Sequence, residues 1–248
     1  MPLYKPYLGI FKTMSMLKKL RFNFMNSKQL VNTDDGSAEL NLSDTKQESI
    51  HDWWDRAHKN DALIWLSGYS GPEIWERLEV DPLLSPKSVV LNIGVGLGYC
   101  THALSGRGCT IHALDISDVA LNRVRSIARP WLADNIASLP INTFDVALSH
   151  LVAQHMLDDA LLPQMRAVIK SLKPNGIFAL HFAKYTDKQS QNEPFTSMAA
   201  KGGGVLRTVE AMEAMAIEAG GEIALSIPKE FSETGGWAWH VIHIRRKL

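Results

Sequence analysis

Residues 88–99 read S-V-V-L-N-I-G-V-G-L-G-Y, and this stretch decides the fold. Its first half is a continuous apolar run of strand length, which is typical of a strand buried on both faces of a parallel sheet. Its second half places glycines at 94, 96 and 98, directly before a segment with helical spacing. Glycine allows a tight turn and lets backbone N–H groups approach a ligand without an intervening Cβ. The stretch therefore predicts a strand, a ligand-binding turn and a helix.

The segments that follow alternate between strands and helices. We expect strands at 110–115, 131–133, 144–149, 176–182, 222–227 and 237–244, and helices at about 97–105, after Ser117, around 162–172 and at 208–219. Such alternation, with right-handed crossovers, predicts a doubly wound, mostly parallel α/β sheet with helices on both faces. In this architecture the ligand crevice lies at the carboxyl ends of the strands.

The second predicted strand ends in an acid, Asp115, about twenty residues beyond the first glycine of the turn. A carboxylate at this position can bind the two hydroxyls of a ribose. The turn and the acid together predict a nucleoside-type ligand. The alternative is structural: Asp115 caps the next helix, and the glycines serve the geometry of the turn alone.

Four segments resemble, in order, the signature segments of class I S-adenosylmethionine-dependent methyltransferases of the small-molecule branch. They are L-N-I-G-V-G-L-G-Y from residue 91, A-L-D-I-S from 113, L-P-I-N-T-F-D-V-A-L-S-H from 139 and L-K-P-N-G-I-F-A-L from 172. The resemblance covers residues 88 to about 182. It implies a Rossmann-like, seven-stranded sheet whose last strand is antiparallel.

The resemblance also implies a cofactor, S-adenosylmethionine, lying over the glycine turn. In such an arrangement Asp115 binds the ribose and Asp134 lies near the adenine amino group. The implied cofactor-binding residues are Tyr69, Asn92, Gly94, Val95, Gly96, Gly98, Asp115, Ile116, Asp134, Asn135, Ile136, Ser149 and His150. Asn92 departs from the family, which usually has an acid there. An amide accepts a hydrogen bond but brings no charge to the cofactor's ammonium.

The candidate catalytic residues follow the fourth predicted strand, in S-H-L-V-A-Q-H from residue 149. A neutral hydroxyl or amine acceptor must lose a proton during methyl transfer. We predict His155 or His150 as the base and Gln154 as a positioning group, with His181 as a further candidate. The alternative is that these side chains only pack or bond a carbonyl. We expect no metal, because His150 and His155 lie five apart and lack a third ligand nearby.

Composition divides the chain into two parts. Residues 1–44 form a basic leader and polar linker, which we expect to be loosely ordered. Residues 45–248 form the predicted methyltransferase domain, with a helical lid at 45–82 and an α/β core at 88–248. In the lid, Trp53 and Trp54 either cover the cofactor or pack the lid onto the sheet.

The overall composition argues against several classes of partner. The 26 basic and 26 acidic residues cancel and no basic stripe is evident, so we expect no nucleic-acid partner. No apolar run is long enough to span a bilayer, although weak peripheral membrane contact through residues 1–30 is an open alternative. Two cysteines without C-x-x-C spacing favour a cytoplasmic location. The sequence predicts no particular oligomeric state.

The predicted function is methyl transfer from S-adenosylmethionine to a small-molecule acceptor, at an oxygen of a polar metabolite or sugar-containing precursor. One alternative is a non-catalytic partner subunit that binds the cofactor. Asn92, which stands where the family usually has an acid, supports this alternative. Another is an NAD(P)-dependent dehydrogenase, whose fingerprint also has a glycine turn followed by an acid. Against the dehydrogenase, the glycine spacing is G-x-G-x-G rather than G-x-G-x-x-G.

Overall fold

The structure is a computed structural model that describes residues 49–59, 69–185, 205–231 and 237–247. The predicted leader and linker, residues 1–44, and parts of the predicted lid lie outside these ranges. Within the described ranges, no helix is both long enough and apolar enough to cross a membrane.

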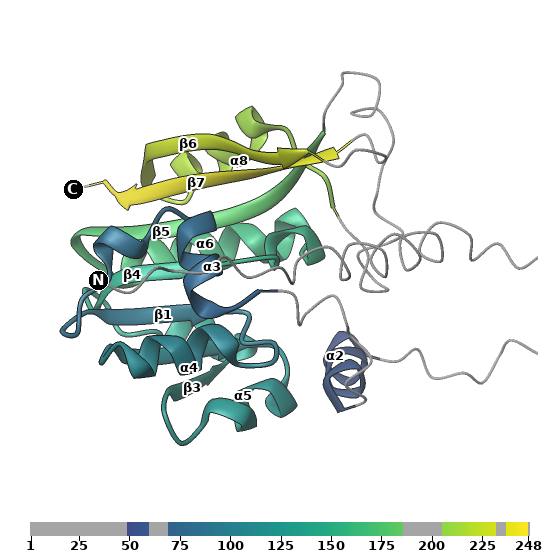
Figure 1. The fold of residues 1–248 in the computed structure, drawn as a ribbon. Helices are drawn as coiled ribbons and strands as arrows, with labels where there is room; N and C mark the ends of the chain where they lie inside the picture. Colours follow the sequence, from purple (N-terminus) through teal and green to yellow (C-terminus); the bar gives the residue numbers. More distant parts are fainter. Residues whose placement is uncertain (1–48, 60–68, 186–204, 232–236, 248) are drawn as a thin grey trace, which may run out of the picture. The chain divides into compact units, whose positions relative to one another are not determined.

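A seven-stranded sheet forms the centre of the domain (Figure 1). The strands are β1 Val89–Ile93, β2 Thr110–Asp115, β3 Arg129–Leu132, β4 Phe144–Ser149, β5 Leu172–Tyr185, β6 Gly221–Phe231 and β7 Trp237–Arg246. Their spatial order is β3-β2-β1-β4-β5-β7-β6. Strands β1 to β5 pair in parallel, and β7 pairs antiparallel with both β5 and β6. The predicted doubly wound sheet with an antiparallel last strand is confirmed.

The order of the strands places a ligand crevice beside β1. From β1 the chain proceeds outward through β2 to β3, and it then returns to form β4 on the other side of β1. The two directions diverge between β1 and β4, which is the switch point where open α/β sheets bind ligands, outside the carboxyl ends of the strands. The glycine turn follows β1 at this end.

Helices cover both faces of the sheet. They are α2 Ile50–Lys59, α3 Gly71–Arg77, α4 Tyr99–Gly106, α5 Asp118–Val124, α6 Asp158–Ser171 and α8 Val209–Glu218, with 3-10 turns η2 Asp81–Leu83, η3 Ala133–Ser138 and η4 Ala153–His155. Helices α3, α4 and α5 pack on one face, and α6 and α8 on the other; in Figure 1, α3 and α4 lie in front of the sheet and α6 behind it. Each face therefore has its own apolar core.

Local capping signals explain where several helices begin. Ser117 Oγ accepts a hydrogen bond from the Ala120 backbone N–H, and Thr208 Oγ1 accepts one from Ala211, each satisfying a backbone donor of the first turn. Ser70 and Glu73 form a reciprocal capping box at the start of α3, where a proline occupies the first turn. The starts after Ser117 and at Thr208 agree with the predicted ones.

Some element bounds differ from prediction. Helix α4 begins at Tyr99 rather than near 97, because Gly98 has φ 87° and stands outside the helix. Strand β3 begins at Arg129, two positions before the predicted start. Strand β5 extends to Tyr185 because it pairs continuously with β7 from Ile177 onward. Pairing with neighbouring strands sets the limits of β3 and β5, whereas the local apolar pattern does not.

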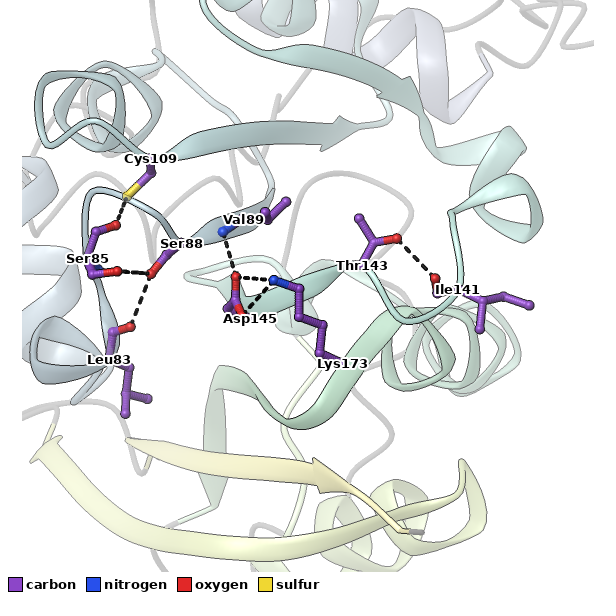
Figure 2. A network of polar contacts seen from close by, with 9 residues as sticks. All are labelled: Leu83, Ser85, Ser88, Val89, Cys109, Ile141, Thr143, Asp145 and Lys173. Carbon is purple, nitrogen blue, oxygen red and sulfur yellow. Dashed lines mark hydrogen bonds and ion pairs between the residues drawn. The ribbon is translucent and has the colours of Figure 1, made fainter.

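A polar network ties together the amino ends of the central strands, as Figure 2 shows. Asp145 accepts a hydrogen bond from the Val89 backbone N–H at 2.8 Å and pairs with Lys173 Nζ at 2.8 and 2.9 Å. Beside it, Ser88 Oγ bonds to the Ser85 hydroxyl at 3.0 Å. These contacts join the starts of β1, β4 and β5. The carboxyl ends of the same strands remain available for a ligand site.

Candidate functional site

A cavity of about 440 Å³ lies at the carboxyl ends of β1, β2 and β4. This volume is within the range of pockets that bind small molecules and cofactors. The predicted site residues that line it are Tyr69, Asn92, Gly94, Val95, Gly96, Asp115, Ile116, His150 and His155. The structure therefore places residues of both predicted groups, cofactor-binding and catalytic, at one cavity.

The glycine turn forms one wall of this cavity. Gly94 has φ 77° and Gly96 has φ 56°, both in the left-handed region that glycine adopts without a steric penalty. A Cβ on Gly94 would lie 2.2 Å from Val152 Cγ2, whereas one on Gly96 would meet no atom within 4 Å. Glycine is thus required at position 94 for two reasons, the backbone angle and the closeness of the Val152 side chain.

Asp115 is built into the glycine turn. Its Oδ2 accepts hydrogen bonds from the backbone N–H groups of Val95 at 2.6 Å and Gly96 at 3.4 Å, and its Oδ1 accepts one from Ser117 at 2.9 Å. Burial raises the pKa of this carboxyl, and the backbone hydrogen bonds and nearby His58 act against that rise. A carboxylate has about four lone-pair sites, so capacity to accept a further hydrogen bond from a ligand remains.

Asn92, where the family usually has an acid, lies at the edge of the turn. It is 4% exposed, and its Nδ2 donates to Thr101 Oγ1 on α4 at 2.9 Å. The amide also lines the cavity. One of its two N–H donors is therefore used by the protein, and its carbonyl oxygen is the group that can accept from a ligand ammonium.

Helix α2 closes the cavity beside α5. Asp55 accepts hydrogen bonds from Ser117 Oγ at 2.5 Å and from the Val119 backbone N–H at 3.3 Å. Arg123 of α5 donates to the His58 carbonyl at 2.6 Å and to the Gly96 carbonyl at 3.1 Å. One arginine thus links α2 to the glycine turn. This part of the predicted lid covers the cavity, and Trp54 and His58 line it.

Asp134 contacts helix α2, and its predicted place near the adenine remains a prediction. Its Oδ1 bonds to His51 Nε2 at 3.2 Å, its side chain is 68% exposed, and it does not line the cavity. The other nitrogen of His51 bonds to the Ile116 carbonyl at 3.0 Å. In this arrangement Asp134 helps to hold α2 against the sheet.

The aromatic rings of His150, His181 and Trp239 form a stack next to the cavity. The centroids of His150 and His181 are 4.8 Å apart, and those of His181 and Trp239 are 4.6 Å apart. Tyr69 meets His150 edge-on at 5.3 Å. Burial lowers the pKa of His150 to about 3 and lowers that of His181 well below its usual value. Both rings are therefore neutral at physiological pH.

His155 faces the cavity from η4. Its ring meets Trp54 of α2 edge-on with a centroid distance of 5.1 Å, and Gln154 Nε2 lies 3.3 Å from its Nε2. Gln154 itself is buried outside the cavity lining, where it supports its neighbour rather than a ligand.

Arg207 holds η4 in place, a role that the sequence did not indicate. Its guanidinium is 5% exposed and donates to the carbonyls of Ala153 at 2.9 Å and Met156 at 2.5 Å, and Nε bonds to Asp158 at 2.8 Å. The two carbonyls flank the turn that carries His155. Arg207 is therefore a positioning residue for this side of the cavity.

Several predicted residues do not line the cavity: Gly98, Asp134, Asn135, Ile136, Ser149 and Gln154. Ser149 is fully buried, and its Oγ has no hydrogen-bond partner among the described residues. Conversely, the cavity includes residues that were not predicted, among them His58, Val152 and Gln164. Gln164 occupies a core position of α6, and in sequence it is one polar residue in an amphipathic helix. No local signal distinguishes it.

Comparison with known proteins agrees with this geometry. Residues 91–180 match the family described as methyltransferase domain, a span from β1 through most of β5. No curated protein matches the chain in sequence.

Solved structures similar to this one include three methyltransferases. A TehB-like SAM-dependent methyltransferase from Corynebacterium glutamicum is 16% identical, with a TM-score of 0.55 over 79% of this chain and 98% of that one. Phosphoethanolamine N-methyltransferase 2 from Haemonchus contortus is 18% identical, with a TM-score of 0.59 over 81% of this chain and 61% of that one. The 1,6-didemethyltoxoflavin-N1-methyltransferase from Burkholderia thailandensis is 15% identical, with a TM-score of 0.58 over 99% and 93%.

The sheet order, the glycine turn and the matched segment define the class of protein. Residues 91–180 match a methyltransferase domain, and the sheet has the fold of the similar SAM-dependent methyltransferases. The resemblance seen in the four sequence segments is thereby confirmed.

Proposed function

We propose that this chain transfers a methyl group from S-adenosylmethionine to a small-molecule acceptor. One observation carries the proposal: within the matched methyltransferase domain, Asp115 is bonded to the glycine turn, and both face a cavity of about 440 Å³. The structures from H. contortus and B. thailandensis were determined with S-adenosylhomocysteine, the demethylated form of this cofactor.

The residues present fit such a cofactor. The glycine turn carries no Cβ at positions 94 and 96, and Asp115 retains one acceptor site for a ribose hydroxyl. Asn92 presents a carbonyl oxygen to an ammonium group, and Trp54 lines the cavity with an aromatic ring, a group that attracts a positively charged sulfur. When bound, the cofactor supplies an activated methyl group on a sulfonium.

The chain's own contribution is to hold the acceptor in line with the methyl group and to exclude water. Orientation of two bound reactants contributes much of the acceleration in such reactions. Helix α2 covers one side of the cavity, where Trp54 packs against His155. The contacts of Asp55 and Arg123 keep this cover in place.

The two histidines on the acceptor side have different environments. His150 is buried and stacked on His181, so its low pKa makes it a poor carrier of a proton. A neutral imidazole can still accept or donate one hydrogen bond, which orients an acceptor hydroxyl or amine. We therefore assign the base to His155 and the orienting role to His150.

For the acceptor we propose an oxygen of a polar metabolite or sugar-containing precursor, with a nitrogen as the alternative. The nitrogen alternative is supported by two similar structures, those of H. contortus and B. thailandensis, which are N-methyltransferases. The fold sets the chemistry of the cofactor more strictly than the identity of the acceptor.

A labelling experiment tests this function. Purified protein is incubated with methyl-labelled S-adenosylmethionine and a small-molecule extract, and labelled products are identified by mass spectrometry. We expect a labelled product whose yield falls at least tenfold in His155→Phe and less in His150→Gln. Binding of the cofactor without any transfer would instead support a non-catalytic subunit. Binding of NADH without S-adenosylhomocysteine would support a dehydrogenase.

A further inference from the structure

The residues around the cavity separate into two sets, one on each face of the sheet. Val95 and Cys100 belong to the core that packs under α4, and Asn92 bonds to α4. Opposite them lies a wall made of Ile93, Leu114, Val152, Ala160 and Gln164, which we call the α6-side wall. Ile93, Leu114 and Val152 of this wall belong to the core under α6.

Gln164 stands out in the α6-side wall. It is 6% exposed, and within the described part of the chain its Nε2 has no hydrogen-bond partner. A buried donor without a partner costs about 1–3 kcal/mol. The remaining members of this wall are aliphatic. A ligand that accepts a hydrogen bond from Gln164 would remove this cost.

Each set of residues suits a different end of S-adenosylmethionine. A charged amino-acid end requires polar groups, and the carbonyl oxygen of Asn92 provides one at the cavity. A flat purine requires apolar surface on its faces, which the α6-side wall provides. Asp115, to which the proposed function assigns the ribose, lies at the end of β2 between the two sets.

We propose that Gln164 recognises the adenine ring of the cofactor, an assignment that rests on the proposed function. A glutamine side chain matches the edge of adenine, because its amide donates to a ring nitrogen while its carbonyl accepts from the exocyclic amine. Asp134, which the resemblance implies for this role, is engaged with His51 outside the cavity. Asp159 of α6 also lines the cavity but is exposed, so Gln164 is the buried polar side chain that α6 offers to the purine.

Calorimetric titration of the full-length protein with two nucleosides tests the proposal. S-adenosylhomocysteine presents an exocyclic amine, and S-inosylhomocysteine presents a carbonyl oxygen in its place. We expect the wild type to prefer S-adenosylhomocysteine at least tenfold. In Gln164→Leu, we expect the affinity for it to fall about tenfold and the preference to shrink to within a few-fold.

Controls separate recognition from damage to the fold. Met165→Leu changes the adjacent buried position of the same helix and should keep the wild-type preference. Gln164→Met preserves chain length and should behave as Gln164→Leu does. In thermal unfolding without ligand, Gln164→Leu and Gln164→Met should be as stable as the wild type, because each substitution removes an unpartnered amide.

The outcomes distinguish two kinds of failure. If the wild type binds neither nucleoside, the proposed function itself is wrong. If the wild type binds S-adenosylhomocysteine but Gln164→Leu retains both the affinity and the preference, the assignment of Gln164 is overturned while the function stands.

Discussion

The buried imidazole of His150 should make the protein less stable in mild acid. The pKa of this ring is about 3 in the folded protein, against an ordinary value of 6.5, and burial is the main cause. Between these pH values the unfolded chain binds a proton at His150 that the folded chain does not. The contribution of this neutral ring to the free energy of unfolding is therefore complete above pH 6.5 and is lost as the pH falls. From pH 7 to pH 5 the loss from this ring alone amounts to about 2 kcal/mol.

Urea denaturation at pH 7 and pH 5 measures this loss. Replacing His150 by glutamine removes the titrating group, so the difference between the two pH values should shrink by about 2 kcal/mol relative to the wild type. His102 is exposed, and His102→Gln should leave the wild-type difference unchanged. The reasoning is refuted if His150→Gln retains the full pH dependence, because the buried ring would then contribute none of it.

Further substitutions test the glycine turn, the support of η4 and the polar network at the opposite edge of the sheet. Gly94→Ala should cost at least about 2 kcal/mol more in thermal unfolding than Gly96→Ala, because both have positive φ but only the first meets a side chain; equal costs would contradict this. Arg207→Ala removes the hydrogen bonds of a buried guanidinium to the carbonyls of Ala153 and Met156 and should cost about 2–4 kcal/mol by urea denaturation, whereas the exposed Arg166→Ala should cost less than about 1 kcal/mol. Asp145→Asn should cost about 1 kcal/mol and leave the affinity for S-adenosylhomocysteine unchanged by calorimetry, since its contacts lie at the amino ends of the strands; a weakened affinity would contradict that separation.

The central strands were predictable because their patterns are local. Residues 110–115 and 144–149 form β2 and β4 with the predicted bounds, since each is a short apolar run between turn signals. The caps at Ser117 and Thr208 were predictable for the same reason, because the capping side chain bonds within three residues. The glycine turn was predictable from spacing alone.

The details of the site depend on contacts between distant segments. The bond from His51 to Asp134 spans 83 positions, and no pattern near Asp134 indicates it. Gln164 belongs to the site only because α6 packs beside it, and Arg207 only because it pairs with Lys184 at the end of β5. A single polar residue on a helix reads the same in sequence whether it faces water or a cavity.

The candidate catalytic residues, His150 and His155, were predictable only in part. Their positions after β4 followed from strand order, and the structure places His150 and His155 at the cavity as expected. Their different environments arise from His181 and Trp54, which come from segments far away in sequence. The proposed division of roles between the two histidines could therefore be inferred only from the fold.

Calorimetric titration of the wild type and Asp115→Ala with S-adenosylhomocysteine tests the central claim most directly. The account predicts saturable binding of one molecule per chain by the wild type. In Asp115→Ala it predicts an affinity reduced at least tenfold, because the substitution removes both the ribose acceptor and the bonds that shape the glycine turn. Binding by a variant that is folded and as tight as the wild type, or no binding by either protein, would contradict it.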